Sequence, residues 1–158
     1  METLRNGLTY LRELAIDQPF SQRLNNWIIE NAEGLNYVAG AYTEESFEDW
    51  KQHVENLGGY LPISNEHCEV NIFGSPEVNI MFRAWHDSIH LQLNEGFDYM
   101  GEVRVAFAQC AELPLDWLFE RQLIMAEVVA QAAHHEKTGN FVSNQRQFTI
   151  EVLIAGRI

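Results

Sequence analysis

Apolar side chains recur at helical spacing in the first part of the chain. They occur in two stretches, first at Leu4, Leu8, Leu11 and Leu14 and then, after Pro19, at Phe20, Leu24, Trp27 and Ile28. Residues three and four positions apart lie on one face of an α-helix, so each stretch can bury one side. The pattern predicts two short amphipathic helices.

A third helix is expected within "TEESFEDWKQHVENLGG", residues 43–59. Thr43 is the expected N-cap, because a hydroxyl at that position can accept a hydrogen bond from the first turn. The residues that follow at helical spacing are Ser46, Phe47, Trp50 and Val54. Gly58 and Gly59 favour the left-handed conformation that ends helices, so we expect the helix to stop there.

Residues 60–76 break the helical pattern with two prolines, a glycine and several β-branched residues. We expect a loop, with a short extended segment around residues 60–74. Ser75 then provides an N-cap and Pro76 suits the first helical position. A periodic stretch continues from there to about Leu93.

Gly96 and Gly101 interrupt the pattern after that helix, and a further helix is predicted from about Met100 to Glu112. Pro114 then ends this helical pattern.

The longest helical pattern covers residues 115–136 and ends at "KTGN". Residues 143–154 are ambiguous, because "FTIEVLI" has β-strand propensity whereas "SNQRQ" resembles a helix start. Residues 1–158 are therefore expected to form a single, predominantly all-α domain. It would be a helical bundle with the candidate functional site at residues 76–118.

Composition and charge narrow the classes of partner. The chain has 158 residues, of which 46% are hydrophobic, enough for one domain with its own core. Ten Lys and Arg residues against 23 Asp and Glu residues give a formal charge of -13. A phosphate backbone or an anionic lipid surface would be repelled, so we expect no nucleic-acid partner.

Cysteine usage and hydropathy indicate the compartment. Cys68 and Cys110 lie far apart and form neither a disulfide framework nor a C-x-x-C pair. No stretch reaches the roughly 18 to 20 apolar residues that a membrane-spanning helix needs. We therefore expect no integral membrane insertion and a cytoplasmic location. Cys110, inside an apolar helix, is expected to be a small buried hydrophobic residue.

Candidate metal-binding residues are concentrated in "RAWHDSIHLQLNEGFDYMGE", residues 83–102. On a helical wheel His86 and His90 lie about 40° apart, on or beside the apolar stripe, and Asp87 lies about 60° beyond His90. A buried imidazole needs a partner for each ring nitrogen, and two at i and i+4 can converge on one cation. An antiparallel neighbouring helix would bring Glu102 opposite them. These donors suit Zn²⁺, Fe²⁺ or Mn²⁺.

The same residues also allow a purely structural interpretation. Asp87 can pair with Arg83 one turn earlier, His90 and Glu102 can be solvated, and a carbonyl can satisfy His86. Spacing alone leaves both interpretations open.

The full spacing, H-D-x-x-H followed by eleven residues and E, is similar to the metal-binding signature of the coenzyme Q (ubiquinone) biosynthesis family. Gly101 before the glutamate and Leu113-Pro114 after the helix add to the likeness, which covers residues 76–118. The resemblance implies a mostly helical fold and a divalent metal, with Zn²⁺ as the expected ion and Fe or Mn as alternatives. The ligands that it implies are His86, Asp87, His90 and Glu102.

The family acts late in quinone head-group assembly, where it is linked to removal of the ring carboxyl group with oxidation of the same carbon, on membranes that carry prenylated intermediates. The chain is shorter than typical members, and its N-terminal half offers no match. Its acidic exterior also lacks the basic face that would hold a peripheral protein on anionic lipid.

The long helix carries Glu127, Gln131 and His134 at i, i+4 and i+7. If this helix packs on the metal residues, Glu127 or His134 can orient a ligand or transfer a proton. Alternatively, Glu127 is exposed and His134 only interacts with the negative end of the helix dipole. The aromatic residues near the motif, Trp85, Phe97 and Tyr99, can line a ligand pocket, but core packing is the expected role.

Three functions are compatible with the sequence. The first is a metalloenzyme acting on a hydrophobic or aromatic, quinone-precursor-like substrate such as a ring carboxylate. The second is a metal-stabilised protein that binds a lipid or quinone without turnover. The third is an acidic interaction or inhibitor protein. Self-association into a homo-oligomer remains open for each.

Overall fold

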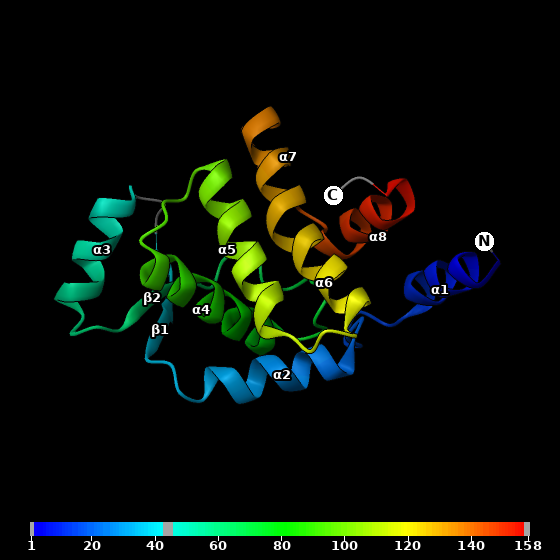
Figure 1. Ribbon diagram of the computed structural model, residues 1–158, viewed down its shortest axis with the longest axis horizontal. Coiled ribbons are helices and arrows are strands. Elements are labelled where there is room, and N and C mark those ends of the chain that lie inside the picture. Colours follow the sequence, from blue (N-terminus) through cyan, green and yellow to red (C-terminus); the bar gives the residue numbers. More distant parts are fainter. Residues whose placement is uncertain (1, 43–45, 157–158) are drawn as a thin grey trace.

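The computed structural model describes residues 2–42 and 46–156, with side chains from residue 7 onward. The helices are α1 (Glu2–Glu13), α2 (Gln22–Ala32), α3 (Phe47–Asn56), α4 (Pro76–Leu93), α5 (Tyr99–Glu112), α6 (Leu118–Met125), α7 (Gln131–Thr138) and α8 (Gln145–Ala155). Two short strands, β1 (Tyr37–Gly40) and β2 (Leu61–Ser64), are the only strands within these ranges. The prediction of a predominantly α-helical single domain is confirmed (Figure 1).

Helix α4 is the central element, in contact with α2, α5 and β2 (Figure 1). Its ends lie where the sequence predicts them. The Ser75 side chain accepts a hydrogen bond from the Val78 amide, and Pro76 occupies the first turn. Asn94 ends the helix in the left-handed conformation, with φ of 53°. Local signals thus fix the register of α4, and with it the positions of both histidines.

The predicted extended segment is present as β2, which pairs in parallel with β1 from Tyr37–Leu61 to Gly40–Ser64. A parallel pair needs a crossover connection, which here contains α3. Trp50 and Val54 of α3 pack with Ile63 of β2 in a second hydrophobic cluster. The N-cap of α3 is Ser46, whose side chain accepts from the Asp49 amide, and the expected cap Thr43 lies outside the described residues.

The helix predicted for residues 115–136 runs without a break from Leu118 to Thr138, through α6, a π-helical turn η1 (Ala126–Ala130) and α7. Gly139 ends it with φ of 73°. The π turn is not foreseen from the sequence. It inserts one residue into the helical repeat, so every side chain after it is rotated by about 100° relative to an uninterrupted α-helix.

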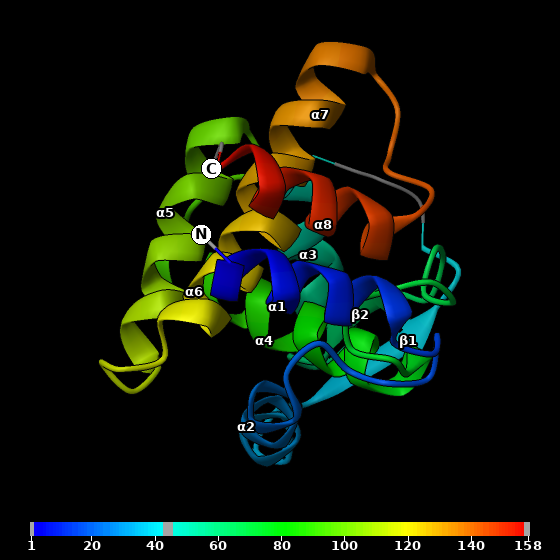
Figure 2. The same cartoon turned by 90° about the vertical axis from the view of Figure 1, so that its right-hand side faces the viewer.

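The ambiguous last segment is a helix, α8, capped by Asn144. It lies beside α1 (Figure 2). Arg146 of α8 is buried and donates hydrogen bonds to the carbonyl oxygens of Ala15, Gln18 and Asn71. The helix-start signal therefore prevails over strand propensity, because the helix brings a buried cation to three main-chain acceptors.

The main core is formed by apolar side chains of α2, α4, α5 and the long helix, including Leu24, Ile28, Phe82, Trp85, Val105 and Leu123. Trp85 is therefore a core residue, and its indole nitrogen donates to Glu112. Cys110 is buried as expected. None of the helices in the described part of the chain is both long and apolar enough to cross a membrane.

Candidate metal centre

His86 and His90 lie one turn apart on α4, and Glu102 lies in the first turn of α5. The connection between the helices is short, and Asp98 caps α5 by accepting a hydrogen bond of 2.8 Å from the Gly101 amide. Gly101, expected to interrupt the helix, is inside this first turn. A Cβ atom there would overlap the Gly96 carbonyl oxygen, so glycine is needed for close approach rather than for breaking the helix.

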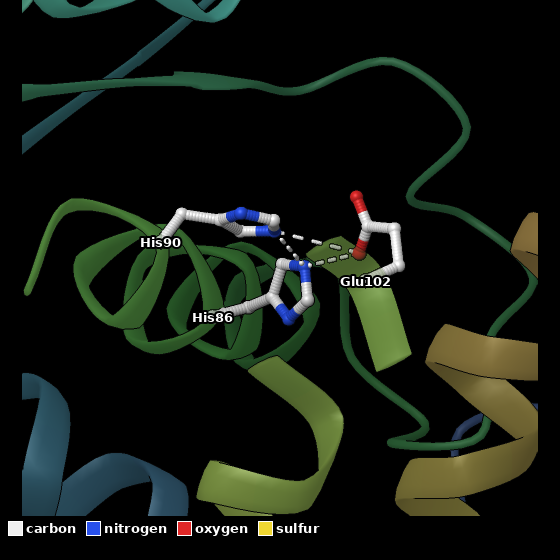
Figure 3. A group of neighbouring side chains, drawn as sticks. All are labelled: His86, His90 and Glu102. Atoms are coloured by element: carbon white, nitrogen blue, oxygen red, sulfur yellow. Dashed lines mark hydrogen bonds and ion pairs between the residues drawn. The ribbon is translucent and has the colours of Figure 1, made fainter. Parts of the chain in front are cut away.

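Three possible metal-donor atoms converge where α4 meets the start of α5 (Figure 3). The Nε2 atom of His86 lies 2.9 Å from Oε2 of Glu102 and 3.0 Å from Nε2 of His90. The Nε2 atom of His90 lies 3.4 Å from the same carboxylate oxygen. The antiparallel α4–α5 pair thus brings three of the four expected ligands together.

The other ring nitrogen of each histidine, Nδ1, also has a hydrogen-bond partner. Nδ1 of His90 lies 2.9 Å from the main-chain carbonyl oxygen of Glu95, and Nδ1 of His86 lies 2.8 Å from Oε1 of Gln109. Both partners are acceptors, so each Nδ1 carries the hydrogen. In the neutral imidazole the lone pair is then on Nε2, and both lone pairs point to the Glu102 carboxylate.

The particular contacts expected under the structural interpretation are not the ones that these described residues make. The His90 side chain is 0% exposed, and the side chains of His86 and Glu102 are mostly buried, at 13% and 18% exposed. Arg83 does not pair with Asp87; its guanidinium donates to the carbonyl oxygens of Ser64, Glu66 and His67. The histidines and the glutamate satisfy one another instead.

Burial and the contact between His86 and Glu102 shift the pKa values of both residues. Burial lowers the pKa of His86, but the charge of Glu102 and its hydrogen bond outweigh that effect and raise the pKa to about 9. Burial raises the pKa of Glu102, whereas the charge of His86, its hydrogen bond and the neighbouring His90 lower it to about 2. Without a metal, a proton on His86 and the ionised Glu102 therefore stabilise each other.

Asp87, the fourth expected ligand, is next to this group but outside the set of donor atoms that lie within 4.8 Å of one another. Burial raises its pKa to about 6, against the lowering effect of His86 and His90. Within the described part of the chain its carboxylate accepts no hydrogen bond, and it lines the pocket beside His86. Its role as a ligand stays a prediction.

A pocket of about 650 Å³ opens beside His86, Asp87 and Glu102. Aromatic side chains form part of its wall, from Trp50, Phe82, Phe97 and Tyr99. Phe97 packs against the second hydrophobic cluster, as expected, and also lines the pocket, whereas Tyr99 is an exposed residue of the pocket wall. Arg83 is the only lysine or arginine among the described lining residues.

Glu127 lines the same pocket, as the sequence suggested. Burial raises its pKa to about 8, against smaller lowering effects of Arg83, of a hydrogen bond from Gln131 and of His86. Gln131 donates to the Glu127 carboxyl group over 2.8 Å. A carboxyl group whose pKa is raised to about 8 therefore lines the same pocket as His86, Asp87 and Glu102.

His134 is placed differently from the expectation. Its ring packs edge-on against Phe148 of α8, with ring centroids 5.5 Å apart, and the described pocket lining includes His135 instead. The π turn explains this, because it shifts the side-chain phase after residue 130. Glu127, Gln131 and His135 share the pocket face, so the proton-transfer role of His134 remains only a sequence prediction.

The sequence pattern did not single out two partners of the histidines. Gln109 is 0% exposed and lies two turns after Glu102 on the same face of α5. A polar side chain among Val105, Ala106 and Cys110 was the available signal. The Glu95 contact is made by a main-chain carbonyl, so no side-chain pattern could reveal it.

Comparison with known proteins gives no match to any protein-family model, curated protein or solved structure.

Proposed function

We propose that this protein binds a divalent metal ion through His86, His90 and Glu102, with Asp87 as the fourth ligand. The observation that carries the proposal is the convergence of two imidazole Nε2 atoms and a carboxylate oxygen, while each Nδ1 is bound to an acceptor oxygen. Three acceptor atoms that face one another repel unless a cation lies between them. A proton can bridge only two of them, whereas a metal ion can bind all three.

The spacing of the donors supports this assignment. With bonds of about 2.1 Å to a metal, neighbouring ligand atoms lie about 3.0 Å apart at a right angle and about 3.4 Å apart at a tetrahedral angle. The three separations of 2.9, 3.0 and 3.4 Å have these lengths. Only small side-chain movements would be required on binding.

The donor types guide the choice of ion. Two imidazoles and a carboxylate are the protein ligands of many catalytic zinc sites, and the same set with open positions also holds iron in non-haem enzymes. We propose Zn²⁺, with Fe²⁺ and Mn²⁺ as the alternatives. The ligand-to-carbonyl contacts of His86 and His90 are typical of catalytic and structural metal sites alike.

We further propose a metalloenzyme that acts on a hydrophobic or aromatic substrate. When bound, the ion would supply Lewis-acid polarisation of a substrate oxygen. The aromatic wall would bind an apolar ring, and Glu127, as a buried neutral acid, could donate a proton or, once ionised, accept one. Arg83 is already bound to three carbonyl oxygens, so a substrate carboxylate would have to meet the metal rather than an arginine.

The motif-level resemblance to the coenzyme Q biosynthesis family supports a quinone-precursor-like substrate with a ring carboxylate. A metal-stabilised protein that binds such a molecule without turnover would have the same site. The two functions differ at Glu127, because Glu127→Gln should abolish turnover in an enzyme while leaving the metal and the bound ligand in place.

Calorimetric titration of the metal-stripped protein with Zn²⁺ tests the metal proposal. The wild type should bind one ion per chain, and Glu102→Gln, which keeps the size but removes the charge, should bind far more weakly. Glu95→Gln is the matched control, because the Glu95 side chain pairs with Arg104 while its main chain makes the contacts with His90. Equal binding by all three proteins, or none by the wild type, would refute the site.

A further inference from the structure

Gln109 contacts the imidazole of His86 at the ring nitrogen that does not face Glu102. Its side-chain oxygen lies 2.8 Å from Nδ1 of His86, on the opposite side of the imidazole from Glu102. The residue belongs to α5, like Glu102, so one helix provides both the carboxylate in front of His86 and the acceptor behind it. The Phe82 ring lies nearly parallel to the imidazole, at an interplanar angle of 18°.

Resting on the metal function proposed above, we propose that Gln109 is a positioning residue that fixes the tautomer and ring orientation of His86 and thereby sets the metal affinity. The carboxamide oxygen can only accept, so it requires a hydrogen on Nδ1 and leaves Nε2 free to bind a metal. Outer partners of this kind orient metal-bound imidazoles and increase their basicity.

The burial of Gln109 argues against a purely structural role. The side chain is 0% exposed, and its Nε2 atom has no hydrogen-bond partner among the described residues. An unpaired buried amide nitrogen is unfavourable, so packing alone does not account for a glutamine at this position. What the amide offers at this position is its oxygen, and that oxygen contacts His86.

The two histidines differ in how they are held. His90 is bound to a main-chain carbonyl, which no side-chain substitution can remove, whereas His86 depends on a side chain. Changes at residue 109 can therefore adjust one metal ligand without moving the helix that carries both. Gln109 is the position at which the affinity of the site can be adjusted.

The test compares Gln109→Met, which keeps length and apolar packing but lacks the acceptor, with Gln109→Glu, which provides a stronger one. Metal-stripped proteins are titrated with Zn²⁺ against a chelator of known affinity. Gln109→Met should bind roughly 10- to 100-fold more weakly, and Gln109→Glu at least as tightly as the wild type. Gln145→Met is the control, because Gln145 is a buried amide that lines the same pocket and donates to the His67 carbonyl.

A second readout needs no metal. In the wild type the His86 Nδ1 hydrogen is held by a buried acceptor, so its ring N–H signal in the NMR spectrum should exchange slowly with water. Gln109→Met should lose this signal while its circular dichroism and melting temperature show a folded protein. Wild-type zinc affinity in Gln109→Met, or an unchanged ring N–H signal, would overturn the proposal.

The two proposals fail in different ways. A wild-type protein that takes up no zinc refutes the metal function, whatever the variants do. A wild type that binds zinc, together with a Gln109→Met variant that binds it equally well, refutes only the role of Gln109. If Gln109→Met does not fold, Gln109→Glu still decides, since a zinc affinity well below the wild type would contradict the role of the acceptor.

Discussion

The Nε2 atoms of His86 and His90 lie 3.0 Å apart, and both face one oxygen of Glu102. The four-residue spacing on α4 brings the two rings together, and the main-chain contact of His90 prevents it from turning away. Two nitrogen lone pairs at this distance repel each other, so the contact needs a hydrogen on one nitrogen or a metal ion between them. The raised pKa of His86 favours a proton there, and under the proposed function a metal ion would displace it.

Zinc should stabilise the folded protein. A ligand at 100 times its dissociation constant adds about 2.7 kcal/mol to the free energy of unfolding. For a chain of this size that corresponds to a rise in melting temperature of roughly 5–10 °C. Thermal melts of the metal-stripped wild type and of His90→Gln, with and without Zn²⁺, check this. A similar zinc-dependent rise in His90→Gln would contradict the assignment of His90 as a ligand.

Asp87→Asn should weaken zinc binding without abolishing it. The Asp87 carboxylate lies beside the three converging donors but outside their group, so it must move to reach the ion. Asn keeps the shape and removes the charge. We expect an affinity loss of roughly 10- to 100-fold, smaller than that of Glu102→Gln. Chelator competition measures both, and a loss as large as that of Glu102→Gln would mean that Asp87 is an equal ligand.

Gly101→Ala should destabilise the protein and displace Glu102. The added methyl group would overlap the Gly96 carbonyl oxygen and lie 2.8 Å from Oδ1 of Asp98, so the turn before α5 must shift. Overpacking of this kind costs about 1–3 kcal/mol. Urea denaturation and zinc titration should both report the loss. Gly34→Ala is the control, since nothing lies within 4 Å of the added atom there.

The stability of the protein should depend on pH through Glu127. Its pKa is raised by burial from an ordinary value of 4.5 to about 8 in the folded state. The protonated form is the one that suits the fold, so its contribution is fully present below pH 4.5 and is lost as the pH rises through 8. Glu127→Gln does not ionise and should avoid this loss.

Denaturant melts at pH 4, 7 and 9 measure this effect. The variant should gain stability relative to the wild type as the pH rises, and the difference should level off above about pH 8. Gln131 can still donate to the side-chain oxygen of the variant, so the hydrogen bond is preserved. A difference in unfolding free energy that is the same at all three pH values would show that Glu127 ionises normally in the folded protein.

Sequence reasoning succeeded where the structure depends on local signals. Ser75 and Pro76 fix the start of α4, which ends at Leu93 as the pattern predicts, and α5 packs against it. The convergence of His86, His90 and Glu102 follows from that geometry. Strand β1 was missed because its pairing with β2 is not local, and its burial does not alternate along the strand.

The π turn is a second feature that could not be predicted from the sequence. It depends on how the long helix packs, and no residue type in Ala126–Ala130 signals it. Counting with an uninterrupted period therefore placed His134 beside Glu127, whereas His135 occupies that face. The structure thus corrects the phase of one helix while leaving its limits nearly as predicted.

Elemental analysis of the purified, untagged protein tests the central claim most directly. The wild type should contain about one divalent metal per chain, and His86→Ala and Glu102→Ala should contain none while their circular dichroism still shows folded protein. No bound metal in the wild type, even after reconstitution with Zn²⁺, Fe²⁺ and Mn²⁺, would contradict the account and leave a protonated histidine–carboxylate cluster as the role of these residues.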